Sequence, residues 1–143
     1  MTVCIDTNVL LQMFGRNARC LAILNALLAG KLALAFSNEI LLEYQEVVSE
    51  MLGPAGWSRI MRLIELMDRL YGNVLRIEPH FRFGVISIDP DDNKFCDCAI
   101  AGNADYVITE DRHFAPLVTA GYRPQPITAD ELSRNSQVSP ILD

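Results

Sequence analysis

The sequence has little positive charge and no long apolar run, and each absence excludes a class of function. Its 143 residues carry 12 Lys and Arg against 18 Asp and Glu, a net charge of −6. This balance argues against the broad phosphate-binding surface of a duplex binder. The apolar runs fall short of the ~18 residues of a membrane span, and the run after Met1 ends at Asp6, so it opens no signal peptide. We expect no membrane association, and we expect any contact with nucleic acid to be local or to be mediated by bound cations.

Paired cysteine motifs and clustered histidines are also missing. Cys4, Cys20, Cys96 and Cys98 lie within apolar segments without CxxC spacing. They are predicted to be reduced packing residues in a cytoplasmic protein. The two histidines, His80 and His113, stand apart with no nucleophile pattern around them. Both are therefore predicted to be surface or packing residues.

The composition is that of one folded domain. Half of the residues are hydrophobic and 21% are charged, which is typical of globular proteins. The length matches a single domain. We expect residues 1–134 to form that domain and residues 135–143 to be a flexible C-terminal tail.

Strand and helix patterns alternate along the chain. Short apolar runs predict strands, and apolar residues at helical spacing predict helices between them. The strands are expected at 2–5, 32–36, 74–77, 106–109 and 126–128, and the main helices at 18–29, 38–52, 57–70 and 92–101. The stretch 80–88 follows neither pattern. Alternation of this kind predicts an α/β fold, a three-layer α/β/α sandwich with a central parallel sheet.

Four acids follow the predicted elements in a way that gathers them at one edge of this sheet. Asp6 follows the first strand and Asp111 follows a later one, Glu43 lies near the start of the helix after the second strand, and Asp92 lies at the start of the next helix. Either Asp91 or Asp92 is also suited to be the N-cap of that helix. Crowded carboxylates repel one another unless protons or cations lie among them. Oxygen ligands favour Mg²⁺ or Mn²⁺, and the lack of nearby histidine or thiolate ligands makes zinc a poorer match.

Each acid also has a structural alternative. Glu43 belongs to a stripe of glutamates on one helix face, and such a stripe is usually a solvent-exposed surface without a catalytic role. The structural alternative for Asp6 is a capping role, and Asp92 competes with Asp89 and Asp91. Asp97 lies ~140° around the helix from Asp92 and is expected to be peripheral.

Four segments resemble the signature segments of PIN-domain proteins. They are Val3–Leu10, Asn38–Tyr44, Asp91–Ala99 and Ala104–Asp111, in the family's order and spacing, within a resemblance that runs from Thr2 to about Leu132. The resemblance implies a Mg²⁺- or Mn²⁺-dependent endoribonuclease whose acidic quartet is Asp6, Glu43, Asp92 and Asp111. It also implies that Asn8 and Thr109 orient the quartet by hydrogen bonds.

More narrowly, these segments are similar to the toxins of toxin–antitoxin pairs related to VapC. That likeness implies an RNA substrate, an antitoxin protein as partner and a homodimer. Lys94 and Arg112 each lie beside a proposed site acid and are expected to contact substrate phosphates as charge-assisted donors. The main alternative is a non-catalytic PIN module that binds a partner protein or RNA, against which the complete quartet argues.

Overall fold

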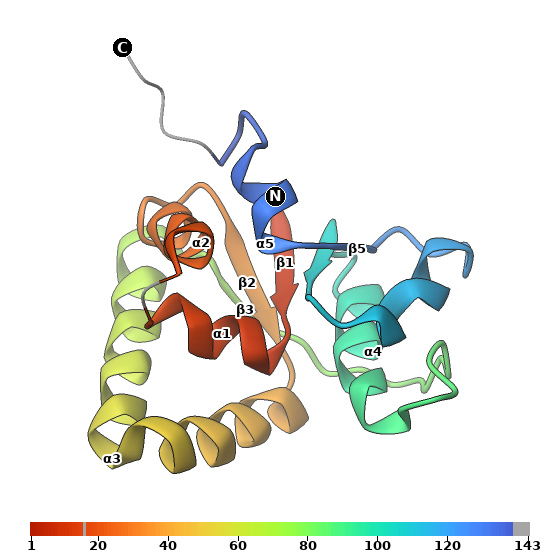
Figure 1. Ribbon diagram of the computed structural model, residues 1–143, viewed down its shortest axis with the longest axis horizontal. Helices are drawn as coiled ribbons and strands as arrows, with labels where there is room; N and C mark the ends of the chain where they lie inside the picture. The colour runs from red at the N-terminus through yellow and green to blue at the C-terminus, as the bar shows by residue number, and fades with distance from the viewer. Residues whose placement is uncertain (16, 139–143) are drawn as a thin grey trace.

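Five parallel strands form the centre of the protein. The computed structural model describes residues 1–15 and 17–138. Its sheet has the order β3-β2-β1-β4-β5 (Figure 1), with strands β1 Thr2–Ile5, β2 Ala33–Phe36, β3 Val74–Arg76, β4 Tyr106–Ile108 and β5 Gln125–Ile127. Val3 of β1 is in register with Leu34 on one side and Tyr106 on the other. The predicted central parallel sheet is confirmed.

Helices cover both faces of this sheet. They are α1 Thr7–Met13, α2 Ala18–Leu28, α3 Asn38–Tyr71, α4 Asn93–Ala101 and α5 Ala129–Ser133, with 3-10 helices η1 Pro90–Asp92 and η2 Arg112–Val118. Figure 1 shows α1, α2 and α3 on one side of the sheet and α4 on the other. The chain builds β1, β2 and β3 outward in one direction and then returns to place β4 and β5 on the other side of β1. Because parallel crossovers are right-handed, reversing the strand order also changes the covered face, and the three-layer α/β/α sandwich follows.

Helix α3 consists of two helical segments that meet at a kink at Gly53. Gly53 has φ 74° and ψ 173°, and Pro54 follows it inside the same 34-residue element. Glycine takes this backbone conformation at little steric cost, and proline fits the first turn of a resumed helix because that turn needs no N–H donor. The prediction of two helices with a stop at Gly53 located the bend, but it restarted the second helix three residues late, at Trp57.

The core closes around the sheet and includes all four cysteines, which are buried free thiols as predicted. Val138 is also buried, and its N–H donates to the Asn135 carbonyl at 2.9 Å. The described part of the expected tail therefore packs on the domain, while residues 139–143 lie outside the described residues. No helix among the described residues is long and apolar enough to cross a membrane.

The stretch without a sequence pattern is held against α4 by side chains of that helix. Asn93 accepts the Ile86 N–H and donates to the Ile86 carbonyl, both at 2.8 Å. Asp97 accepts the Phe83 N–H at 3.0 Å and is itself buried. Burial raises the pKa of Asp97, and the hydrogen bond from Phe83 acts in the opposite direction. Asp97 thus has a structural contact of its own.

Candidate functional site

The candidate site lies where the strand order reverses, between β1 and β4. Asp6 directly follows β1, and its backbone N–H donates to the Ile108 carbonyl at the end of β4, at 2.9 Å. Thr109 directly follows β4. The carboxyl ends of these strands therefore open onto one crevice, which is where open α/β sheets bind ligands.

Asp6 is buried and held by Thr109. The Thr109 hydroxyl donates to Asp6 Oδ2 at 2.8 Å and accepts the Asp111 N–H at 3.0 Å. One side chain thus joins the end of β1 to the loop after β4. Burial raises the pKa of Asp6; the hydrogen bond from Thr109 opposes this rise, and repulsion by Asp111 and Glu43 adds to it. Keeping Asp6 ionised therefore calls for positive charge nearby.

Asp92 faces the other acids rather than its own helix. It occupies the N-cap of α4, as predicted, but its carboxylate accepts no hydrogen bond from the described helix backbone. Burial raises its pKa to about 7, and repulsion by Asp6, Asp89, Asp111 and Glu43 adds to the effect. The structure thus places the four predicted acids within electrostatic reach of one another. Their role as metal ligands stays a prediction.

Glu43 is fixed by two neighbours. Lys94 Nζ lies 2.7 Å from Glu43 Oε1, and the Thr7 hydroxyl donates to Glu43 Oε2. Lys94 is 11% exposed and also lies 3.2 Å from Asp91 Oδ1. Burial alone would lower the pKa of Lys94, but its hydrogen bonds to Glu43 and Asp91 raise it above the ordinary value. In this structure the ammonium neutralises part of the acid cluster, and its predicted contact with substrate stays a prediction.

An open cavity of about 620 Å³ lies beside Asp6. It is lined by Asp6, Asn8, Leu11, Gln12, Glu110, Asp111, Arg112 and His113. Asn8 and Arg112 are both exposed there. A ligand in the cavity would reach both of them together with Asp6 and Asp111. The orienting role of Asn8 and the phosphate contact of Arg112 stay predictions.

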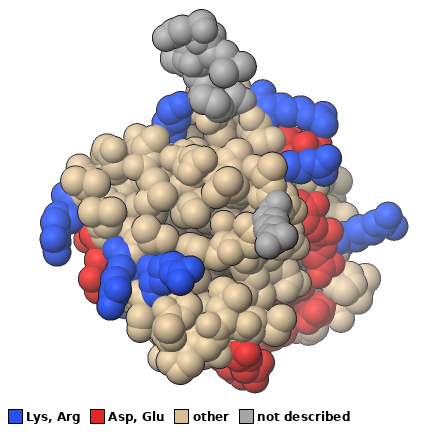
Figure 2. Space-filling model, turned by 60° about the vertical axis from the view of Figure 1, so that its left-hand side comes forward, with Lys and Arg blue, Asp and Glu red and all other residues tan. Residues whose placement is uncertain are grey.

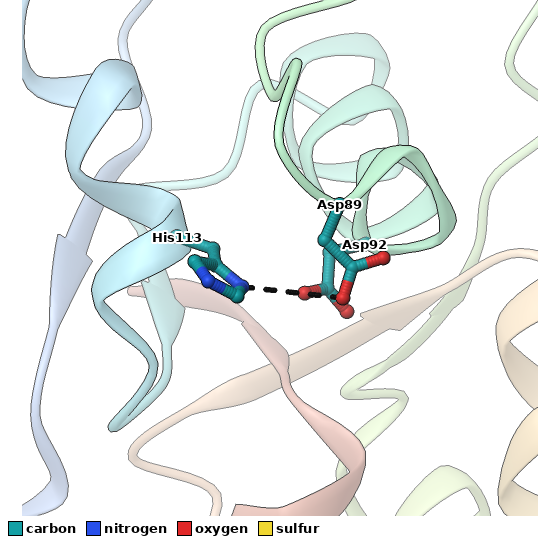
Figure 3. Close-up of side chains that lie close together, drawn as sticks. All are labelled: Asp89, Asp92 and His113. Atoms are coloured by element: carbon teal, nitrogen blue, oxygen red, sulfur yellow. Dashed lines mark ion pairs between the residues drawn. The ribbon is translucent and has the colours of Figure 1, made fainter.

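Sequence reasoning missed the site contacts of His113 and Thr7, and it considered Asp89 only as a competitor of Asp92. His113 Nδ1 lies 3.4 Å from Asp111 Oδ1 and 3.9 Å from Asp89 Oδ2. Figure 3 shows the side chains of Asp89, Asp92 and His113 directed toward one another. One ligand atom from each of the three lies within 4.8 Å of the others. The prediction of a surface residue agrees with its 42% exposed side chain, but His113 is not isolated, because two carboxylates lie near it. Its place two residues after Asp111 was the available signal, because a short turn returns that side chain to the acid.

The donor chemistry fits a divalent cation. Burial and repulsion by neighbouring acids raise the pKa values of Asp6 and Asp92, and Glu43 and Asp111 are among the acids that repel both. Hard cations bind through such oxygen ligands and relieve the repulsion among them. Figure 2 shows one face of the molecule, with acidic residues in a strip along one side and basic residues mainly toward the opposite side and the margins.

Solved structures with this fold include two multi-protein complexes. One is the crystal structure of VapBC2 from Rickettsia felis bound to a DNA fragment from their promoter, with 16% identity, a TM-score of 0.58, and coverage of 89% of this chain and 99% of that chain. The other is FitAcB from Neisseria gonorrhoeae, with 19% identity, a TM-score of 0.53, and coverage of 85% of this chain and 95% of that chain. At such identities the likeness concerns the fold.

No curated protein matches the sequence significantly. The family comparison is more direct, because residues 2–113 match the family described as PIN domain. This match spans most of the chain, both sides of the strand reversal and all four acids of the candidate site. The chain therefore belongs to the PIN-domain family.

Proposed function

We propose that the protein is a ribonuclease that depends on Mg²⁺ or Mn²⁺ and hydrolyses RNA phosphodiester bonds. The observation that carries the proposal is that Asp6, Glu43 and Asp111, from three other segments, lie close enough to Asp92 to repel its carboxylate and raise its pKa. Membership in the PIN-domain family supports a nuclease, and the cavity beside Asp6 leaves room for a substrate.

The proposed chemistry divides between the cation and the chain. A divalent cation held by the four acids would supply water activation and neutralisation of the charge that develops on phosphate. The protein holds the acids in place: Thr109 bonds to Asp6, and Thr7 bonds to Glu43. Because the site is acidic and the chain carries a net charge of −6, RNA affinity should fall sharply when the cation is removed.

We further propose that this ribonuclease is the toxin of a toxin–antitoxin pair. VapBC2 and FitAcB share its fold, and the first was solved on promoter DNA as a complex. An antitoxin protein, a homodimer and a cytoplasmic location belong to this proposal. Co-expression with the product of a neighbouring gene, followed by copurification and a toxicity assay with and without that product, tests it.

Cleavage of labelled single-stranded RNA with Mg²⁺ or Mn²⁺ is the direct test of the nuclease. An Asp6→Asn, Asp92→Asn double variant should lose metal-dependent cleavage. A Glu46→Gln, Glu50→Gln variant is the matched control, because it removes two exposed charges of α3 outside the cluster. Equal cleavage by wild type and the first variant would point to a contaminating nuclease and contradict the assignment.

A non-catalytic PIN module that binds a partner protein or RNA is the second candidate. The observation in its favour is that both carboxylate oxygens of Glu43 already have partners, Lys94 and Thr7. Wild-type protein that is folded and binds RNA in the presence of chelator, yet cuts none of several RNAs, would support this module instead.

A further inference from the structure

The cluster of Asp89, Asp92 and His113 is not explained by the four-acid site. Asp89 precedes η1, Asp92 ends it, and His113 lies in η2 on the far side of the strand reversal. Their ligand atoms nevertheless all lie within 4.8 Å of one another. An imidazole among carboxylates changes which cations the site prefers, so the cluster bears on the choice of metal.

The imidazole nitrogen that faces these acids has no hydrogen-bond partner. His113 Nδ1 is shielded from solvent and makes no hydrogen bond to the described residues, although Asp111 and Asp89 oxygens lie near it. The backbone of His113 is anchored beside these acids, because its N–H donates to Asp111 Oδ1 at 2.9 Å. A buried polar atom without a partner is uncommon in folded proteins and calls for a ligand or ion. Figure 3 shows it aimed at the Asp89 and Asp92 carboxylates.

We propose that Asp89, Asp92 and His113 form a cation subsite beside the four acids, and that His113 makes this subsite select Mn²⁺ over Mg²⁺. The inference rests on the proposed function, because Asp92 is common to both sets. Carboxylates bind either ion, whereas an imidazole nitrogen is a better ligand for first-row transition metals than for Mg²⁺. Two oxygen ligands and one nitrogen ligand therefore leave Mg²⁺ with one poor ligand of three.

The observed spacing needs only small side-chain movements to close on an ion. Two ligands of one ion at bonds of about 2.1 Å lie at most roughly 4 Å apart. The Asp89 and His113 side chains are 44% and 42% exposed, so they can rotate without repacking the core. Asp92 is partly buried, and it links the subsite to the candidate active site because it belongs to both sets.

The test measures cation binding rather than turnover. Purified metal-free protein is titrated with Mn²⁺ alone and Mg²⁺ alone, and bound Mn²⁺ is examined by pulsed electron paramagnetic resonance for ¹⁴N coupling from imidazole. His113→Ala should weaken Mn²⁺ binding at least about tenfold and change Mg²⁺ binding by less than about threefold. The ¹⁴N coupling should vanish in the same variant. His80→Ala is the matched control, because it removes the other histidine of the chain.

A second variant guards against misfolding of the first. Asp89→Asn acts from a different segment at an exposed side chain, and it should also weaken Mn²⁺ binding while the ¹⁴N coupling of the remaining bound Mn²⁺ persists. Bound Mn²⁺ without ¹⁴N coupling in wild type, or equal Mn²⁺ affinity in wild type and His113→Ala, overturns the subsite. If RNA is still cleaved when either result is obtained, the proposed ribonuclease function is unaffected. If Mn²⁺ shows ¹⁴N coupling but the protein cleaves no RNA, the subsite is supported and the ribonuclease function is contradicted.

Discussion

Replacing Asp92 by Asn should stabilise the metal-free protein at alkaline pH. The folded protein raises the pKa of Asp92 from 3.8 to about 7, through burial and then through repulsion by the surrounding acids. Because the folded pKa is the higher one, the stability that protonated Asp92 contributes is complete below about pH 3.8. It is lost as pH rises through about 7. Asn is nearly isosteric and cannot ionise, so the variant does not incur this loss.

The size of the effect follows from the shift. Three pKa units correspond to a ceiling of about 4 kcal/mol in the free energy of unfolding. Partial exposure of Asp92 and screening by salt reduce this value. We expect the free energy of unfolding of Asp92→Asn, relative to that of wild type, to increase by about 1–2 kcal/mol from pH 4.5 to pH 8.

Urea unfolding in the presence of a chelator at both pH values measures this gain. Asp91→Asn is the control, because it makes the same substitution one residue away, at a carboxylate that is 80% exposed. Mg²⁺ or Mn²⁺ at pH 8 should raise the stability of wild type more than that of Asp92→Asn. If the difference in free energy of unfolding between wild type and Asp92→Asn is the same at pH 4.5 and pH 8, the electrostatic argument for the cluster is refuted.

Three further substitutions test other contacts. Thr109→Val removes the hydroxyl that holds Asp6, and it should lower RNA cleavage about 10- to 100-fold and the free energy of unfolding by about 1–2 kcal/mol, measured by the RNA assay and urea unfolding. Lys94→Met leaves Glu43 without its ammonium partner. The midpoint temperature of thermal unfolding, measured in chelator at pH 8, should therefore fall by several degrees and recover when Mg²⁺ is added. Asn73→Leu removes two hydrogen bonds to buried carbonyls, and urea unfolding should show a loss of about 2–3 kcal/mol.

The fold was predictable because its signals are local. Each strand is a short apolar run between turn residues, and the alternation with helices admits few topologies. The parallel sheet and its two covering layers therefore follow from sequence alone. The segment 80–88 did not, because its conformation depends on hydrogen bonds to Asn93 and Asp97 rather than on any periodicity of its own.

The candidate site was predictable where it depends on the ends of elements. Asp6 and Asp111 follow strands, so the topology alone brings them to one edge. The contacts of Thr7 and His113 were not predictable in this way, because they depend on side-chain directions within a first helical turn and a 3-10 helix. For His113 the only signal in the sequence was its place two residues after Asp111, because its approach to Asp89 forms only when the loops fold.

Lys94 lies at the acid cluster, as its sequence position indicated, but in the structure it pairs with Glu43. Its place two residues after Asp92 indicated a donor for substrate phosphate, and the structure does put its ammonium among the acids. There it pairs with Glu43 at 2.7 Å and is largely enclosed, so contact with phosphate requires this ion pair to open. A divalent cation at the acids supplies the condition for that opening, because it replaces the ammonium as the counter-charge of Glu43. Cation binding and phosphate binding are then coupled through one side chain, and Lys94→Met should weaken RNA binding only when the cation is present.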